Sequence, residues 1–150
     1  MTRYSRQISL PEIGEGGQEK LHKARVLIVG AGGLGSPAAL YLAGAGVGTI
    51  GLADDDTVGI SNLQRQILYT ENEVGQLKVH CAAQRLRALN GNIEVHAHPF
   101  RLNRENARRL IADYDIVVDG CDNFSTRYLI SDSCSALRKP YVCLLYTSPS

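Results

Sequence analysis

Short apolar runs alternate along the chain with longer segments of helical periodicity. A run of about four to eight β-branched and aliphatic residues between turn residues is typical of a buried strand, whereas apolar residues at every third or fourth position indicate a helix. The apolar runs predict strands at residues 25–30, 47–53, 92–100, 114–120 and 140–142. The helical pattern predicts helices at residues 34–46, 76–90, 103–111 and 124–139, and the end of a short helix at residues 19–24.

Residues near the helix ends support these boundaries. Pro37 lies in the first turn of helix 34–46, where its missing N–H does no harm, and Gly44 and Gly46 are stop signals. Asn103 is a suitable N-cap for helix 103–111. The alternation of strands and helices predicts an α/β fold, namely a Rossmann-like, doubly wound and mainly parallel sheet with helices on both faces.

The chain has the features of one domain, because it contains no internal repeat, no low-complexity block and no obvious linker. We assign residues 1–142 to this domain. Residues 143–150 follow the last predicted strand but offer neither another helix nor another strand. We therefore expect the fold to be truncated before its C-terminal part, and we interpret residues 143–150 as a non-native tail.

Composition and charge exclude several classes of partner. The sequence is 44% hydrophobic and 21% charged, which is ordinary for a soluble globular domain. Lys and Arg number 16 against 15 Asp and Glu, so global charge favours neither nucleic acid nor an anionic membrane as partner. The apolar runs are too short to span a membrane and the N-terminus lacks a signal peptide core, so a cytoplasmic location is expected.

Cysteine and histidine spacing gives little support for a metal site. The four cysteines form no Cys-x-x-Cys pair, so we interpret them as reduced thiols of the core and not as zinc or redox ligands. They are Cys81, Cys121, Cys134 and Cys143. His96 and His98 share a face of a predicted strand, but no third ligand lies nearby, and a solvated strand face is the favoured interpretation.

A glycine-rich loop follows the first predicted strand and opens the next helix. Gly30, Gly32 and Gly35 match Gly-x-Gly-x-x-Gly in this context, and Gly33 adds a further glycine. Glycines let the backbone approach a phosphate, and the free N–H groups and dipole at a helix start favour negative charge. The alternative is a glycine turn that only packs the helix on the strand, and the motif alone does not choose between cofactors.

Acidic residues end the second predicted strand. Asp54 lies where a carboxylate accepts hydrogen bonds from ribose hydroxyls in a Rossmann-type site, which fits NAD and ATP equally. Asp55 and Asp56 follow it. For Asp55 a solvated turn is the favoured interpretation, whereas we retain Asp56 as a nucleotide-binding candidate.

The next candidates favour a triphosphate over a nicotinamide. Asn62, Arg65 and Lys78 supply hydrogen-bond donors and fixed cations, which suit phosphates better than a flat, uncharged ring. Taken singly, each has a structural alternative: Ser61 would cap a short helix, and Arg65 and Lys78 would lie on solvated surfaces. Their joint occurrence makes that alternative the weaker one.

The fourth predicted strand ends in Asp-Gly-Cys-Asp-Asn. Asp122 lies where ligands bind in open α/β sheets and would hold Mg²⁺ against phosphates, because Mg²⁺ prefers carboxylate and phosphate oxygens. The alternative is that Asp122 or Asn123 is the N-cap of helix 124–139, and both roles are compatible.

Several motifs in order resemble the MoeB/ThiF branch of the ubiquitin-activating superfamily. They are RYSRQI, GAGGLG, D-x-D-x-V-x-x-SNLQRQ, VGQLK, and VVDGCDN followed by an arginine. The resemblance runs from about Arg3 to Val142 and is more specific than any one of the motifs. It implies an ATP-dependent adenylyltransferase that acts on the Gly-Gly carboxylate of a ubiquitin-like sulfur-carrier protein and releases pyrophosphate.

The resemblance also assigns roles to residues. It implies that the glycine loop with Gly33 contacts the ATP phosphates, that Asp54 contacts the ribose, and that Lys78 contacts phosphate. Asp122 and Asn123 would complete the site and its magnesium, and Arg6 would reach across a homodimer into the partner's site. The residues that would line the nucleotide are Ser61, Asn62, Leu63, Gln64 and Arg65.

The resemblance leaves part of the function open. Members of the family act in molybdopterin or thiamine biosynthesis, and these residues do not choose between the two carriers. Zinc is expected only in a C-terminal part beyond these residues. An NAD-binding oxidoreductase is the main alternative, motivated by the glycine loop and Asp54 alone. A nucleotide-binding module without catalytic activity is a third interpretation.

Overall fold

The protein is built around one parallel β-sheet. The computed structural model describes residues 2–145, and its five strands lie in the order β3-β2-β1-β4-β5. All neighbouring pairs are parallel. The strands are β1 (Arg25–Val29), β2 (Thr49–Ala53), β3 (Glu94–His98), β4 (Ile116–Asp119) and β5 (Tyr141–Cys143). The five predicted strands are therefore confirmed: β1 to β4 are somewhat shorter than their apolar runs, and β5 is shifted by one residue.

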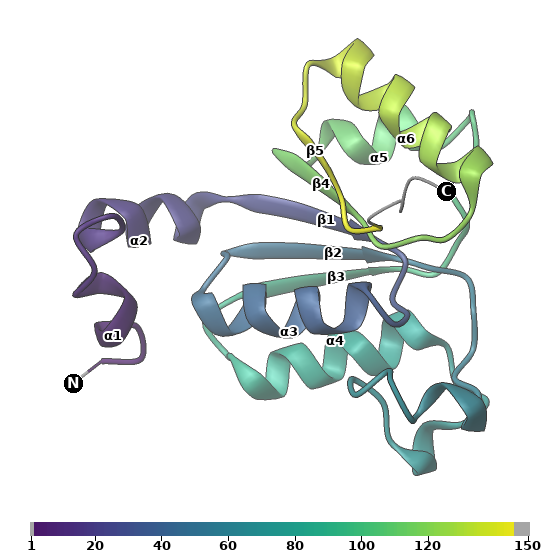
Figure 1. Ribbon diagram of the computed structural model, residues 1–150, viewed down its shortest axis with the longest axis horizontal. Coiled ribbons are helices and arrows are strands. Elements are labelled where there is room, and N and C mark those ends of the chain that lie inside the picture. Colours follow the sequence, from purple (N-terminus) through teal and green to yellow (C-terminus); the bar gives the residue numbers. More distant parts are fainter. Residues whose placement is uncertain (1, 146–150) are drawn as a thin grey trace, which may run out of the picture.

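Helices cover both faces of this sheet (Figure 1). Helices α3 and α4 pack on one face and α5 and α6 on the other, so the predicted doubly wound α/β fold is confirmed. The helices are α1 (Ser5–Ile8), α2 (Gly14–Lys23), α3 (Gly35–Ala45), α4 (Lys78–Leu89), α5 (Ala107–Ala112) and α6 (Phe124–Leu137), with short 3-10 helices η1 (Ile60–Asn62) and η2 (Glu71–Glu73) before α4.

The central strand β1 shows why the strands read as unbroken apolar runs. Its successive side chains point to opposite faces, with Val26 and Ile28 in the core under α3 and α4 and Leu27 and Val29 in the core under α5 and α6. Since helices cover both faces, every position after Arg25 is buried. The sheet is thus a rigid platform that fixes where the loops at its edge begin.

The start of α5 and the end of α3 differ from those predicted. The helix expected at residues 103–111 begins only at Ala107, because the Asn103 side chain accepts hydrogen bonds from the backbone N–H groups of Glu105 and Asn106 at 2.9 Å each and forms a turn instead. Gly44 does not end α3 but is part of it. The stop is at Gly46, whose φ is 91°.

The polar N-terminal segment forms two helices where only the end of one was expected. Few apolar residues mark α1 or the start of α2, and side-chain hydrogen bonds hold them to the end of α3. Gln7 and Gln18 both donate to the carbonyl oxygen of Ala45, at 2.6 and 3.1 Å. These contacts join residues far apart in the sequence, so local periodicity does not predict them.

The C-terminal residues continue the sheet slightly beyond the predicted boundary at residue 142. Strand β5 ends at Cys143, and the backbone N–H of Leu144 donates to the carbonyl oxygen of Asp119 at 2.9 Å. Residues 146–150, which belong to the predicted tail, lie outside the described residues. Within residues 2–145, none of the helices combines the length and the apolar character needed to cross a membrane.

The topology leaves a crevice at one edge of the sheet. Strands β1 and β4 are neighbours, but the chain leaves β1 toward α3 on one face and leaves β4 toward α6 on the other. The loops at their carboxyl ends therefore diverge, which is the arrangement that creates ligand sites in open α/β sheets.

Candidate functional site

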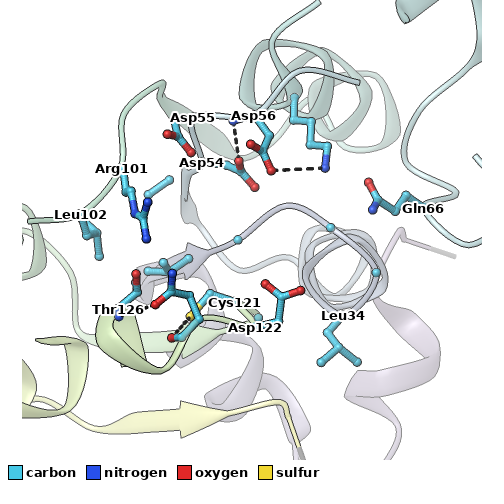
Figure 2. Close-up of a pocket in the computed structure, with 18 of the residues that line it drawn as sticks. Leu34, Asp54, Asp55, Asp56, Gln66, Arg101, Leu102, Cys121, Asp122 and Thr126 are labelled. Atoms are coloured by element: carbon cyan, nitrogen blue, oxygen red, sulfur yellow. Dashed lines mark hydrogen bonds and ion pairs between the residues drawn. The ribbon is translucent and has the colours of Figure 1, made fainter. Parts of the chain in front are cut away.

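A cavity of about 690 Å³ lies over this crevice. Its walls come from the loops that follow β1, β2, β3 and β4, and from the start of α4. Figure 2 shows polar side chains from these loops pointing into it from several sides. Its volume is in the range of pockets that hold small-molecule ligands and cofactors.

The glycines of the first loop serve two purposes. Gly30 has φ of 90°, and a Cβ on it would lie 2.9 Å from the backbone nitrogen of Cys121. A Cβ on Gly35 would lie 1.8 Å from the carbonyl oxygen of Gly30. Gly30 and Gly35 therefore need glycine for close packing, as expected for a turn that packs the helix on the strand. Gly32 and Gly33 face the cavity.

Asp54 fastens this loop to the end of β2. Its Oδ2 accepts a hydrogen bond from the backbone N–H of Ala31 at 2.7 Å, and its Oδ1 accepts one from the N–H of Asp56 at 2.8 Å. A carboxylate has about four acceptor positions. Asp54 therefore keeps acceptor capacity toward the cavity, which it lines.

Lys78 and Asp56 form a loose ion pair inside the cavity. The Lys78 Nζ lies 3.9 Å from the Asp56 Oδ2, and the Lys78 side chain is only 6% exposed against 71% for Asp56. Partial burial, with repulsion from Asp54, raises the pKa of Asp56, although Lys78 opposes the shift. The ammonium group is thus buried with one distant counter-charge, and an anion in the cavity would give it a closer one.

Of the predicted cluster at residues 61–65, the structure brings two residues to the cavity. Arg65 is exposed, lies against Gly33, and donates from Nη1 to the carbonyl oxygen of Ser61 at 3.3 Å. Asn62 accepts from the backbone N–H of Gly59 at 2.8 Å and lines the cavity. The other three, Ser61, Leu63 and Gln64, lie outside the cavity lining.

The loop after β4 closes the opposite side. Asp122 is exposed and lines the cavity, and Figure 2 shows its carboxylate directed toward the glycine loop. Asn123 is the N-cap of α6: its Oδ1 accepts from the N–H of Thr126 at 3.2 Å and from the hydroxyl of Ser125 at 2.6 Å. The capping alternative therefore applies to Asn123, and Asp122 remains available to a ligand.

A buried carboxylate supports the floor under this loop. Asp119 is fully buried and accepts hydrogen bonds from the backbone N–H of Cys121 at 2.9 Å and from the hydroxyl of Tyr141 at 2.8 Å. The Nε of Arg127 lies 3.9 Å from it. Burial, with the neighbouring Asp119, raises the pKa of Cys121 to about 12, so this thiol stays protonated at neutral pH and is no nucleophile.

Other predicted candidates lie elsewhere. Arg6 is in α1, at the end of the sheet opposite the cavity (Figure 1). His96 contacts Glu94 at 3.3 Å and His98 contacts the Tyr114 hydroxyl at 2.8 Å, so the two imidazoles have different partners.

Sequence reasoning missed several residues of the lining, among them Gln66, Phe100, Arg101 and Leu102. The last three follow β3 directly, and their position at the carboxyl end of a strand was a usable signal. Gln66 follows Arg65 within the same motif but carries no charge, so its role was not apparent.

Fold and site together define a Rossmann-like α/β domain with cationic, amide and acidic side chains converging over its glycine loop. Residues 4–144 match the protein-family model described as the ThiF family. The chain therefore belongs to the ThiF family, as its motifs predicted.

Relatives with known names cover nearly all of this chain. It is 57% identical over 142 residues to adenylyltransferase and sulfurtransferase MOCS3 of Anopheles gambiae, a match that covers 95% of this chain and 32% of the relative. It is 51% identical over 142 residues to sulfur carrier protein adenylyltransferase of Thermus thermophilus, covering 95% of this chain and 52% of the relative. The chain thus spans from about a third to about half of the length of these relatives.

A solved structure shows the same fold. The tRNA N6-threonylcarbamoyladenosine dehydratase TcdA of E. coli, determined in complex with ATP, is 30% identical to this chain and matches it with a TM-score of 0.89. The match covers 94% of this chain and 58% of TcdA.

Proposed function

We propose that this chain is the nucleotide-binding part of an adenylyltransferase that uses ATP to activate the C-terminal Gly-Gly carboxylate of a ubiquitin-like sulfur-carrier protein. The observation that carries the proposal is the convergence of Arg65 and Lys78, from separate segments, on the cavity that also holds the glycine loop and Asp122. The names of the two relatives, an adenylyltransferase and sulfurtransferase and a sulfur carrier protein adenylyltransferase, support the same activity.

ATP would lie across the cavity with its phosphates over the glycine loop. The N–H groups at the start of α3 and the helix dipole favour negative charge there. Arg65 and Lys78 add two cations. Asp54 offers its remaining acceptor positions to the ribose, and Phe100 and Leu102 supply apolar surface for the base. Two cations beside the loop suit a triphosphate better than the flat, uncharged nicotinamide ring that an NAD-binding oxidoreductase must hold, so we favour ATP.

The proposed reaction is attack by the carrier's carboxylate on the α-phosphorus, which forms an acyl-adenylate and releases pyrophosphate. A carboxylate is already ionised near neutral pH, so no general base is required. The residues of this chain would act by aligning the two substrates and by neutralising phosphate charge with Arg65 and Lys78.

Asp122 fits a role in holding Mg²⁺. Its exposed carboxylate lines the cavity and forms neither a hydrogen bond nor an ion pair within residues 2–145, so its oxygens are free to bind a hard cation together with phosphate oxygens. When bound, Mg²⁺ would neutralise charge on the phosphates.

The assembly we propose is a homodimer, in which Arg6 of one protomer reaches the cavity of its partner. Its place in α1, at the far end of the sheet, means that Arg6 would act only from a second copy. The substrate is a sulfur carrier of the molybdopterin or thiamine type.

Exchange of labelled pyrophosphate into ATP, with a Gly-Gly carrier and the full-length protein, tests the proposal. We expect Arg65→Ala and Lys78→Ala each to raise the transition-state free energy by about 2–4 kcal/mol, which lowers the exchange rate by about 30-fold to 900-fold. The physical reason is the loss of one preorganised cation beside the phosphates.

Matched controls are Arg85→Ala and Lys20→Ala, which remove exposed cations that do not line the cavity. Their exchange rates should equal that of the wild type. Because Lys78 is buried at the start of α4, thermal unfolding of Lys78→Ala would be followed in parallel. Full exchange in both cavity variants, or none in the wild type with any Gly-Gly carrier, would contradict the proposal.

A further inference from the structure

Arg127 is the arginine that follows the VVDGCDN motif, and the proposed reaction does not involve it. It lies in the first turn of α6, and its side chain is 15% exposed. Its Nε and Nη2 atoms are buried and have no hydrogen-bond partner within the described part of the chain. Buried polar atoms nearly always have a partner, and charged groups are the most costly to leave without one. These two donors therefore need an explanation.

The counter-charge of this guanidinium is near but not in contact with it. The Nε of Arg127 lies 3.9 Å from Oδ2 of Asp119, whose side chain is fully buried. This distance exceeds the range of about 2.7–3.2 Å for an N–H···O hydrogen bond. The ring of Phe124 shields the guanidinium from solvent, with its centroid 5.0 Å from Cζ of Arg127. Arg127 and Asp119 thus form a loose ion pair inside the protein.

Both members of the pair have capacity for a closer contact. A carboxylate has about four acceptor positions. Asp119 uses two of them, for the backbone N–H of Cys121 and the hydroxyl of Tyr141. Nε and Nη2 together form the edge of a guanidinium that binds a carboxylate through two parallel hydrogen bonds. The two donors that lack a partner therefore match the acceptor positions that Asp119 still has.

Arg127 connects the two ends of the loop that carries Asp122. At the start of the loop, Asp119 holds the N–H of Cys121 at 2.9 Å. At its end, the backbone N–H of Arg127 donates to the carbonyl oxygen of Asn123 at 3.1 Å. Between these points the carboxylate of Asp122 is directed toward the glycine loop (Figure 2). The position of Asp122 thus depends on the distance between Arg127 and Asp119.

We propose that Arg127 is a positioning residue of the nucleotide site, which pairs closely with Asp119 when ATP and Mg²⁺ are bound and so holds Asp122 toward the metal. This inference rests on the proposed function. Arg127 lies outside the cavity lining, so it acts through Asp119 and the loop and does not touch the nucleotide. Closure of the pair would give both of its donors an acceptor.

Calorimetry on the full-length protein tests this role through the ratio of ATP affinity with Mg²⁺ to ATP affinity with EDTA. Arg127→Met removes the charge and keeps a similar length, whereas Arg127→Lys keeps the charge but not the paired donors. We expect Arg127→Met to lower the ratio about 10-fold, because loss of one hydrogen bond to a charged group has about this effect. Arg127→Lys should lower the ratio less. Affinity for ATP with EDTA should stay close to that of the wild type.

Asp119→Asn tests whether Arg127 acts through Asp119. This variant keeps the shape of the side chain but leaves the buried guanidinium without a counter-charge, which is destabilising. The double variant Asp119→Asn/Arg127→Met removes both charges. Because a pair acts as one unit, the double variant should have the same affinity ratio as Arg127→Met. Without ATP, it should unfold at a higher denaturant concentration than Asp119→Asn.

The affinity ratio also separates positioning from a structural role. A pair that only stabilised the fold would lower the denaturant midpoint of the Arg127 variants and leave the ratio unchanged. Arg85→Met is the matched control, since Arg85 is an exposed arginine of α4 outside the cavity lining. Its affinity ratio and its denaturant midpoint should both equal those of the wild type.

Three results would overturn the inference while leaving ATP binding and adenylation intact: an unchanged ratio in Arg127→Met, independent and additive losses from Asp119→Asn and Arg127→Met, or unfolding of both Arg127 variants without ATP. A wild-type protein that binds ATP equally with Mg²⁺ and with EDTA would contradict the magnesium role of Asp122 and this inference with it. A wild-type protein that binds no ATP would overturn the proposed function itself.

Discussion

At the scale of single residues, the carboxylate of Asp54 shows how a binding residue also holds its site together. Both of its oxygens accept backbone hydrogen bonds, from the N–H groups of Ala31 and Asp56. The loop that would lie under the phosphates is therefore tied to the residue that would contact the ribose. Substituting Asp54 would change the empty site as well as the bound one.

We predict that Asp54→Ala lowers the free energy of unfolding by about 1–3 kcal/mol without any nucleotide, because the N–H groups of Ala31 and Asp56 lose their acceptor. Urea unfolding followed by circular dichroism measures the change. Asp55→Ala is the control: Asp55 is exposed, and its removal should change stability by no more than about 0.5 kcal/mol. Equal stabilities of the two variants would show that these hydrogen bonds add nothing to the fold.

The sequence predicted the principal side chains of the cavity but not their full set. Arg65, Lys78 and Asp122 were found because charged residues occur together after the glycine loop and at a strand end, although each of them singly had a structural alternative. The cluster at residues 61–65 lies in an irregular segment around η1, where no periodicity indicates which side chains face inward. The neutral amide of Gln66 carried no signal, since its lack of a partner is visible only in three dimensions.

At the scale of elements, α3 contains two glycines with opposite requirements. Gly35 begins the helix so close to the preceding loop that a Cβ would lie 1.8 Å from the carbonyl oxygen of Gly30. Gly44, near the other end, is exposed and has nothing within 4 Å of the position of a Cβ. The same residue type is thus required by packing at one end of the helix and unnecessary at the other.

This contrast predicts opposite effects of the same substitution. Gly44→Ala should raise the free energy of unfolding by about 0.5–1 kcal/mol, because alanine loses less backbone entropy on folding into a helix. Gly35→Ala should destabilise the protein, since the loop or the helix must move to admit the methyl group. Thermal unfolding of the two variants beside the wild type measures both effects, and a stabilised Gly35→Ala would contradict the described geometry.

Strands were predictable from the sequence to a greater extent than helix limits. The inner strands β1, β2 and β4 are buried on both faces, so each appears as an unbroken apolar run, whereas the outer strands β3 and β5 are partly exposed. Helix limits depend on polar side chains that compete for the backbone, as Asn103 does before α5. Helices α1 and α2 are held by Gln7 and Gln18 at the end of α3, contacts that no local pattern contains.

At the scale of the whole molecule, the two parts of the proposed site, the cavity and Arg6, lie at opposite ends of the strands. The cavity is at the carboxyl ends of the strands, whereas α1 with Arg6 is at the edge where the strands begin (Figure 1). One copy therefore does not unite Arg6 with Lys78. A complete site of the proposed kind needs two copies.

Subunit mixing gives the corresponding prediction. Arg6→Ala and Lys78→Ala homodimers should each have low pyrophosphate exchange. Mixed dimers of the two variants should regain activity, because one of their two sites combines an intact Arg6 with an intact Lys78. The measurement is exchange activity after co-refolding in equal amounts. Each variant mixed with itself is the control, and a mixture no more active than its components would exclude action between subunits.

The hydrogen bonds of Asp119 have a mechanical consequence. This single buried carboxylate is bonded to the backbone under the cavity, at Cys121, and to the hydroxyl of Tyr141 in the outermost strand. A shift of the outermost strand would therefore strain a hydrogen bond to the same carboxylate that holds the cavity floor. The sheet margin and the bottom of the pocket are thus linked through one side chain.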